Sequence, residues 1–264
     1  MEEQVARPFG IDFGGSGIKG APVDLGVGEF AAPRVRIETP TPATPAKVAD
    51  VVAELLDRSG ATADAVVGIT VPAVVVHGTV RSAANIDKTW IGEDAETLFS
   101  TRLGRSVTVL NDADAAGYAE ARYGAAKGQG GLVIVTTLGT GIGSALVYDG
   151  ALVPNSELGH LEIDGHDAES RAANSVREDK NMSWEKWADR LTAYYRTLEA
   201  LFSPELFVIG GGVSKDADKF VPLIKVDTPI VAATLRNTAG IVGAALIAHE
   251  HAATPPKRPA ARRR

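Results

Sequence analysis

Near its start the chain reads Asp12-Phe13-Gly14-Gly15-Ser16-Gly17-Ile18-Lys19, a glycine turn between two short apolar runs. A second stretch, Leu138-Gly139-Thr140-Gly141-Ile142-Gly143, follows the β-branched run 132–137. In each case the pattern predicts two strands joined by a tight turn. Glycines let backbone N–H groups converge on an anion, and a Ser or Thr hydroxyl adds a donor. Each turn is therefore typical of a phosphate-binding loop.

The repeated turn indicates a duplicated α/β fold. An offset of 124 positions places Gly15-Ser16-Gly17-Ile18 on Gly139-Thr140-Gly141-Ile142. The 264 residues suffice for two lobes of about 130 residues each. We expect a small amino-terminal lobe at 1–111, to which part of the terminal helix returns, and a larger carboxy-terminal lobe at 112–250. Residues 251–264 are expected to form a disordered basic tail.

The amino-acid composition excludes several classes of site and of protein. The chain has no cysteine, which excludes disulfides, thiolate catalysis and zinc sites that need sulfur ligands, while a hard ion such as magnesium remains open. Its net charge of −6 argues against general nucleic-acid binding. Since no apolar run approaches the roughly 20 residues of a membrane span, we expect no membrane association and a cytoplasmic protein.

Local signals place the remaining elements. A helix is expected from Thr44 as N-cap to Gly60, because Pro45 suits a first helical position and glycine suits a helix end. An alanine-rich helix should follow Asp112 and continue to about Tyr123. Further strands are expected at 30–38, 65–71, 73–82, 107–110, 144–148, 151–153 and 206–209, and further helices at 94–103, 166–178, 183–202 and 238–249.

Two other interpretations of the first turn are tested by its context. Gly15-x-Gly17-x-x-Gly20 has dinucleotide-binding spacing, and Glu38 lies at a suitable distance for a ribose contact. That fingerprint must open a helix, however, whereas Pro22 and a glycine-rich turn follow here, so the loop is expected to join two strands. The interpretation as a Walker A loop is excluded, because that motif requires glycine before its lysine and Ile18 precedes Lys19.

Several motifs occur together in one order. They are Asp12 to Lys19, Leu110-Asn-Asp-Ala-Asp-Ala-Ala-Gly117, Leu138 to Gly143, Glu157-Leu-Gly-His160 and Gly210-Gly-Gly212. Over about residues 9–248 the chain thereby resembles the sugar kinases of the ROK family. Within that family it is most similar to the polyphosphate glucokinases, through the segments Arg81–Gly92, Pro154–Glu162 and Asn237–Ala244.

The resemblance implies a two-lobed, actin-like fold built from duplicated ribonuclease-H-like α/β units. It implies an enzyme that transfers a phosphoryl group from inorganic polyphosphate to the 6-hydroxyl of glucose, with ATP as a further donor, magnesium as cofactor and a homodimer as the working form. An ATP-dependent glucokinase or mannokinase of the same family is the alternative. A non-catalytic sugar-binding regulator is less favoured, because Asp112 and both glycine turns are present.

Site residues are carried over from the matching motifs. Asp112 is expected to be the general base, since it follows a strand whose carboxyl end should face the site; as an isolated residue it could equally be a helix N-cap. The residues expected to bind glucose are Asn85, Asn111, Asp112, Glu157, His160 and Glu169. The residues expected to bind phosphate are Asp12, Gly14, Gly15, Ser16, Gly17, Lys19, Thr140, Gly141, Gly211 and Gly212, with Asp12 also positioning magnesium.

Overall fold

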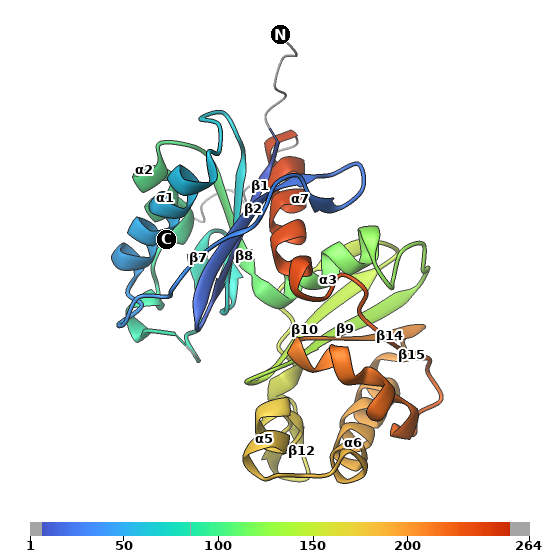
Figure 1. Ribbon diagram of the computed structural model, residues 1–264. Helices are drawn as coiled ribbons and strands as arrows, with labels where there is room; N and C mark the ends of the chain where they lie inside the picture. The colour runs from blue at the N-terminus through green and yellow to red at the C-terminus, as the bar shows by residue number, and fades with distance from the viewer. Residues whose placement is uncertain (1–6, 85, 254–264) are drawn as a thin grey trace, which may run out of the picture. The chain divides into compact units, whose positions relative to one another are not determined.

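The computed structural model describes residues 7–84 and 86–253, which form two compact units (Figure 1). The first unit ends at Asp112 and takes in the terminal helix from Gly240, and the second comprises Ala113–Ala239. Asp112 thus falls in the first unit, one residue beyond the boundary expected from the sequence. The terminal helix continues to Ala253, beyond the expected start of the tail at 251, because alanine favours helix; residues 254–264 lie outside the described residues.

The first unit is built on a mixed sheet. Its strand order is β3-β2-β1-β5-β8, and β4 also pairs with β2. These strands are β1 (Phe9–Gly14), β2 (Gly17–Asp24), β3 (Glu29–Phe30), β4 (Val35–Ile37), β5 (Val67–Val71) and β8 (Val107–Asn111). The β1–β2 pair is an antiparallel hairpin, whereas β1, β5 and β8 run parallel, so the carboxyl ends of three strands lie at one edge.

The second unit repeats this order. Its sheet runs β11-β10-β9-β14-β15, made of β9 (Leu132–Leu138), β10 (Ile142–Tyr148), β11 (Ala151–Val153), β14 (Leu206–Gly210) and β15 (Ile230–Ala232). Again an antiparallel hairpin, β9–β10, lies beside parallel strands, here β14 and β15. The duplication predicted from two short glycine turns therefore extends over whole sheets.

Helices cover both faces of the first sheet (Figure 1). On one face α1 (Pro45–Ser59) and α2 (Ala95–Leu103) enclose a core in which the Phe13 and Trp90 rings lie 5.8 Å apart. On the other face α7 (Ala239–Ala253) approaches so closely that a Cβ at Gly10 would come within 1.8 Å of the Ile241 carbonyl oxygen. Glycine at position 10 is required by this contact between strand and helix backbones.

The second sheet is covered in the same way. On one face α6 (Trp184–Phe202) buries Trp187, Leu191 and Tyr195 against the sheet. On the other face α3 (Asp112–Tyr123) packs with Gly117 against β10, where a Cβ would lie 2.4 Å from the Ala145 methyl. The helix that follows the last strand of each sheet thus belongs to the other unit, since α3 follows β8 and α7 follows β15.

Most predicted elements are confirmed, and α1 ends as expected at Gly60, whose φ is +65°. The predicted strand 30–38 is wrong, because Pro33 has no N–H to donate and separates β3 from β4. The predicted strand 73–82 is a small hairpin of β6 (Val75–Val76) and β7 (Thr79–Val80). Other short elements are β12 (Glu162–Ile163), η1 (Lys88–Trp90), η2 (Leu158–His160), η3 (Gly212–Lys219), η4 (Val221–Leu223) and η5 (Arg236–Thr238).

The predicted helix 166–178 is also wrong. Residues His166–Asp167 form strand β13, which pairs with β12. Two short helices follow, α4 (Glu169–Ala172) and α5 (Asn174–Asp179), separated at Ala173 by an extended ψ of 151°. No helix within residues 7–84 and 86–253 is long and apolar enough to cross a membrane.

Candidate active site

The first glycine turn is a tight hairpin in the first unit. Strands β1 and β2 pair as far as Gly14 and Gly17, which leaves residues 15–16 as an exposed loop. Because this turn joins two strands and opens no helix, the dinucleotide-binding interpretation is excluded. Thr39 Oγ1 donates a hydrogen bond of 2.6 Å to the Gly14 carbonyl, so a side chain from outside the hairpin supports the turn.

Two cations lie beside this turn. Lys19 on β2 is directly opposite Arg36 on β4, and Arg36 Nη2 donates a 2.7 Å hydrogen bond to the Ser16 carbonyl. The guanidinium covers Gly17, where a Cβ would meet Arg36 Nε at 2.7 Å. Like charges directly opposite one another destabilise a sheet, and a bound anion would remove that repulsion. The two cations beside the first glycine turn therefore favour the binding of a phosphate group there.

Asp12 lies between this turn and the parallel strands. Its Oδ2 is 3.6 Å from Lys19 Nζ, and its Oδ1 accepts a 3.2 Å hydrogen bond from Thr70 Oγ1. The first turn of α7 is close by, since a Cβ at Gly240 would lie 3.5 Å from Asp12 Oδ1. The Asp12 side chain is 26% exposed, so its oxygens remain accessible to a metal ion or a phosphate.

Asn111 and Asp112 lie where β8 gives way to α3. The buried Asn111 side chain donates from Nδ2 to the Ala73 carbonyl over 3.1 Å, which fixes the orientation of its amide. Asp112 is half-buried at the carboxyl end of β8 and at the first turn of α3, where the helix dipole stabilises a carboxylate. Asp114 is buried and accepts a 2.7 Å hydrogen bond from the Asn155 N–H, which anchors that segment.

The second glycine turn, in the second unit, is held differently. The Ile142 N–H donates a 3.0 Å hydrogen bond to Glu169 Oε2. At the start of α5, Ser175 donates from Oγ to the Thr140 carbonyl over 2.7 Å and from its N–H to the Gly139 carbonyl over 3.1 Å. A carboxylate and a hydroxyl thus fix the second turn, whereas a cation supports the first.

The triple-glycine loop lies beside this second turn. Gly211 has a φ of +83°, and a Cβ there would come within 2.5 Å of the Leu138 carbonyl oxygen. Only glycine fits both the left-handed conformation and the close approach. Gly212 then begins η3, and a Cβ there would meet open space. The structure therefore brings together two of the predicted phosphate-binding segments.

The segment with the predicted sugar-binding pair is seated on β10. A Cβ at Gly159 would lie 2.1 Å from the Ile142 carbonyl oxygen, so glycine is required for this contact. The Leu158 N–H donates a 2.9 Å hydrogen bond to Ser144 Oγ on the same strand. These contacts set the positions of Glu157 and His160 at the two ends of the short helical turn η2.

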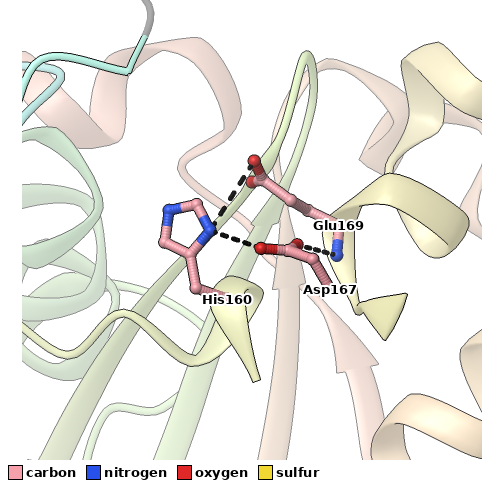
Figure 2. Close-up of side chains that lie close together, drawn as sticks. All are labelled: His160, Asp167 and Glu169. Carbon is pink, nitrogen blue, oxygen red and sulfur yellow. Dashed lines mark hydrogen bonds and ion pairs between the residues drawn. The ribbon is translucent and has the colours of Figure 1, made fainter. Parts of the chain in front are cut away.

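Figure 2 shows His160, Asp167 and Glu169 converging. His160 Nδ1 is 2.9 Å from Asp167 Oδ2 and 3.9 Å from Glu169 Oε1, while His160 Nε2 is 3.8 Å from Glu157 Oε2. The Glu169 N–H donates a 3.2 Å hydrogen bond to the second oxygen of Asp167. One imidazole is thus surrounded by three carboxylates.

The charges in this cluster shift one another's pKa values. The hydrogen bond to Asp167 raises the pKa of His160, and the charges of Glu169, Asp167 and Glu157 add to this effect, whereas partial burial opposes it. The pKa of Glu157 is raised chiefly by its partial burial and further by Glu169, while His160 lowers it. A protonated histidine among carboxylates is therefore favoured.

The same three side chains have the spacing of a possible metal site. His160, Asp167 and Glu169 each offer one ligand atom, and these atoms lie within 4.8 Å of one another. The cluster is accessible to solvent and is already joined by the hydrogen bonds above, and acidic groups in that setting are common without an ion. We therefore treat it as a hydrogen-bonded group.

The structure thus groups the predicted residues within each unit. Asp12 and Lys19 lie together beside the first turn, and Glu157, His160 and Glu169 form one cluster in the second unit. Asn85 lies outside the described residues.

Sequence reasoning missed Arg36 and Asp167. Arg36 belongs to none of the family motifs, and Asp167 was assigned to a helix, whereas helical structure begins only at Glu169 and Asp167 lies in β13. The spacing of seven residues between His160 and Asp167 could have suggested a hairpin contact, because Asp164-Gly165 between them is a strong turn signal.

Comparison with known proteins gives a consistent result. The model of the ROK family matches residues 8–172. The chain is 52% identical over 239 residues to the polyphosphate glucokinase of Mycobacterium tuberculosis, covering 90% of this chain and 89% of that one. It is 51% identical to the polyphosphate glucokinase of Mycobacterium leprae, covering 91% of this chain and 74% of that protein.

Solved structures agree. An inorganic polyphosphate/ATP-glucomannokinase from Arthrobacter sp. strain KM superposes with a TM-score of 0.90 at 53% identity, covering 93% of this chain and 99% of that one. A ROK family glucokinase from Streptomyces griseus, in complex with glucose and AMPPNP, gives a TM-score of 0.80 at 25% identity, covering 92% and 99%. The chain belongs to the ROK family and has the actin-like α/β fold of its sugar kinases.

Proposed function

We propose that the chain transfers a phosphoryl group from inorganic polyphosphate to the 6-hydroxyl of glucose and releases glucose 6-phosphate. The observation that carries this proposal is the 52% identity to a polyphosphate glucokinase, because it extends over 90% of this chain and 89% of that one. The phosphate-binding and sugar-binding motifs singled out in the sequence supply the chemical groups that such a reaction needs.

Glucose recognition is assigned to the cluster in the second unit and to Asn111. Each sugar hydroxyl donates one hydrogen bond and accepts others, so a site for glucose needs both acceptors and donors. Glu157 and Glu169 supply carboxylate acceptors, and His160, between them, supplies a nitrogen. The Asn111 amide is oriented by its bond to the Ala73 carbonyl, so it lies in a defined direction at the carboxyl end of β8.

Asp112 is proposed as the general base. Its carboxylate takes the proton of the glucose 6-hydroxyl as the oxygen attacks the terminal phosphorus, and the shortened polyphosphate leaves with the electrons of the broken P–O bond. Its place at a strand end and a helix start supports this role, since sites of open α/β sheets lie at the carboxyl ends of strands and a helix start favours negative charge.

The donor phosphates are assigned to both glycine turns and the triple-glycine loop. In the first unit, Lys19 and Arg36 add positive charge beside the turn residue Ser16. In the second, the Thr140 hydroxyl and the Gly141 backbone provide polar groups in the turn that follows Leu138, the residue that Gly211 approaches. Side-chain cations and backbone N–H groups are the usual means of holding a phosphate chain.

Magnesium is proposed as the cofactor, with Asp12 as the protein group that positions it. The ion prefers oxygen ligands and is commonly bound through one or two carboxylates plus substrate phosphates. The partly exposed Asp12 carboxylate fits this preference, because its contacts to Thr70 and Lys19 leave lone pairs on both oxygens. When bound, the ion would offset negative charge on the donor phosphates.

ATP as a second donor and mannose as a second acceptor are proposed from the Arthrobacter relative, whose name includes both ATP and glucomannokinase. The 27% identity to the glucokinase of Streptomyces coelicolor, over 92% of this chain, keeps an ATP-dependent glucokinase as the second candidate. A cytoplasmic homodimer is also proposed, and sedimentation equilibrium tests it, because a monomer would sediment at half the mass.

The test of the proposed function is formation of glucose 6-phosphate with magnesium, comparing long-chain polyphosphate with ATP at equal phosphoryl concentration. We expect polyphosphate to support turnover and EDTA to abolish it. Turnover with ATP alone would replace the proposal by the second candidate. Glucose binding without product from either donor would contradict both and favour a regulator.

A further inference from the structure

We infer that Asp167, which matches none of the predicted site residues, is a positioning residue of the glucose site. One oxygen of its carboxylate holds the His160 ring at Nδ1 over 2.9 Å, and the other accepts the backbone N–H of Glu169 over 3.2 Å (Figure 2). One side chain therefore sets the place of two residues to which sugar binding is assigned. The inference rests on the proposed function, because it concerns the same site.

The local backbone explains how Asp167 reaches both partners. Strands β12 and β13 form a two-residue hairpin in which Glu162 pairs with Asp167. Its turn residues, Asp164 and Gly165, have φ values of +51° and +73°, as a tight hairpin turn requires. The hairpin begins just after His160 and ends just before Glu169, so Asp167 closes the loop between them.

Asp167 is also joined to the start of helix α4. Ser170 Oγ donates a 2.6 Å hydrogen bond to the Asp167 carbonyl, and the Asp167 side chain accepts from the N–H two residues on. An aspartate that accepts from nearby backbone N–H groups holds a turn or helix start in place. The carboxylate is therefore fixed by its own backbone when it meets the imidazole.

This contact determines which nitrogen of His160 faces the sugar. An ionised carboxylate only accepts hydrogen bonds, so the His160 nitrogen beside Asp167 must carry the proton. In the neutral ring, Nε2 then has a free lone pair for a sugar hydroxyl, and in the protonated ring it becomes a donor. Without Asp167 either tautomer is allowed, and the ring can rotate away from Glu157, which lies 3.8 Å from Nε2.

The same carboxylate links the sugar cluster to the second glycine turn. Asp167 holds the Glu169 backbone, and Glu169 Oε2 in turn accepts the Ile142 N–H at that turn. Releasing Asp167 would therefore displace Glu169 as well as His160. An ordinary surface aspartate, by contrast, would contribute little to stability and nothing to glucose affinity, and Asp167 is 42% exposed.

The test compares Asp167→Asn and Asp167→Ala with Asp164→Asn, which removes a charge from the tip of the same hairpin. In Asp167→Ala we expect the KM for glucose to rise about tenfold, because a charge-assisted hydrogen bond to a sugar-binding residue is lost. Asp167→Asn, which can still accept one hydrogen bond, should fall between Asp167→Ala and the wild type. The KM for polyphosphate should change less than the KM for glucose, and the melting temperature should stay close to that of the wild type.

A second readout reports on the ring itself. In ¹⁵N NMR of histidine-labelled protein, at a pH high enough for the ring to be neutral, we expect wild-type His160 to carry its proton on Nδ1 and Asp167→Ala to give a mixture of tautomers. Glucose KM values like those of Asp164→Asn, in an active enzyme with an unchanged tautomer, would overturn the inference. Failure of the proposed function is distinguishable, because the wild-type enzyme itself would then form no glucose 6-phosphate.

Discussion

The two glycine turns have the same backbone plan, but different charged groups support them. In the β1–β2 turn, Arg36 donates a hydrogen bond to the Ser16 carbonyl. Lys19 on β2 lies directly opposite Arg36 on β4. In the β9–β10 turn, a carboxylate of Glu169 accepts the Ile142 N–H, and Ser175 supports the Thr140 carbonyl. A duplicated hairpin has thus acquired cations in one unit and a carboxylate in the other.

This difference indicates that the two turns have different functions. Phosphate is stabilised by nearby cations, so the first turn is suited to hold the charged donor by itself. At the second turn, the Ile142 N–H already serves Glu169, which belongs to the proposed sugar cluster. We therefore propose that the second turn serves mainly sugar binding, and changes at the two turns should have different kinetic effects.

The largest effect should come from the carboxylate proposed as general base. Asp112→Asn in the first unit should lower kcat about a hundredfold or more, because the proposed base is lost, while the melting temperature changes little. Asp114→Ala, just inside the second unit, should instead destabilise the fold by about 1–3 kcal/mol, since the Asn155 N–H loses its partner. Turnover and thermal unfolding of both variants test this contrast. A fully active Asp112→Asn enzyme would contradict it.

The two helix-covered sheet faces should respond unequally to an added methyl group. Gly10→Ala should cost about 3 kcal/mol, since its Cβ would meet the Ile241 carbonyl oxygen of α7 at 1.8 Å. Gly117→Ala on α3 should cost about 1–2 kcal/mol, because alanine's better helix propensity offsets part of the contact with Ala145. Urea unfolding of both variants measures the difference. Equal losses of stability would contradict the prediction and would mean that α7 and α3 can both move away from their sheets to accommodate a methyl group.

Kinetic parameters should separate the two turns directly. Lys19→Ala should raise the KM for polyphosphate about tenfold and leave the KM for glucose near its wild-type value, because a phosphate-binding cation is lost. Glu169→Gln should do the reverse, raising the KM for glucose by a similar factor. Steady-state kinetics with each substrate varied in turn provides the measurement. Parallel changes in both variants would remove the proposed division.

The smallest effect should be a pH dependence confined to the second unit's cluster. The folded-state pKa of His160 lies above its ordinary value of 6.5, so its protonated form stabilises the fold below about pH 6.5. That contribution is lost as the pH rises through the folded pKa. The difference in melting temperature between wild type and His160→Gln should therefore shrink from pH 6 to pH 8.5. A difference that stays constant with pH would show that folding leaves the pKa of His160 unchanged and would contradict the effect of its carboxylate neighbours.

Much of the backbone was predictable because its signals are local. Glycine turns between β-branched runs predicted both hairpins, and Gly60 marked the end of α1. The helix predicted at 166–178 failed because its composition concealed a hairpin. Asp164 and Gly165 reverse the chain there, and His166 and Asp167 pair with β12. β15 was missed because a strand of three residues carries too little periodicity, whereas the equally short β11 was predicted from the Asp149-Gly150 turn before it.

The candidate site was predictable only in part, for a related reason. Motif resemblance pointed to Glu157 and His160, because the spacing Glu-x-Gly-His is characteristic. Arg36 and Asp167 act through contacts across strands and across a hairpin, and nothing in the neighbouring sequence marks those contacts. Their partners are set by strand register, which tertiary packing decides.

The sequence by itself determined the glycine turns, the duplication and the family, because these depend on short runs of residues whose backbone preferences are local. Only the tertiary structure decided which charges surround each turn. Strand pairing places Arg36 beside the first turn, and the helix after β13 places Glu169 beside the second. Strand register and helix packing decide which residues far apart in the sequence come into contact. A local sequence pattern carries no information about such contacts.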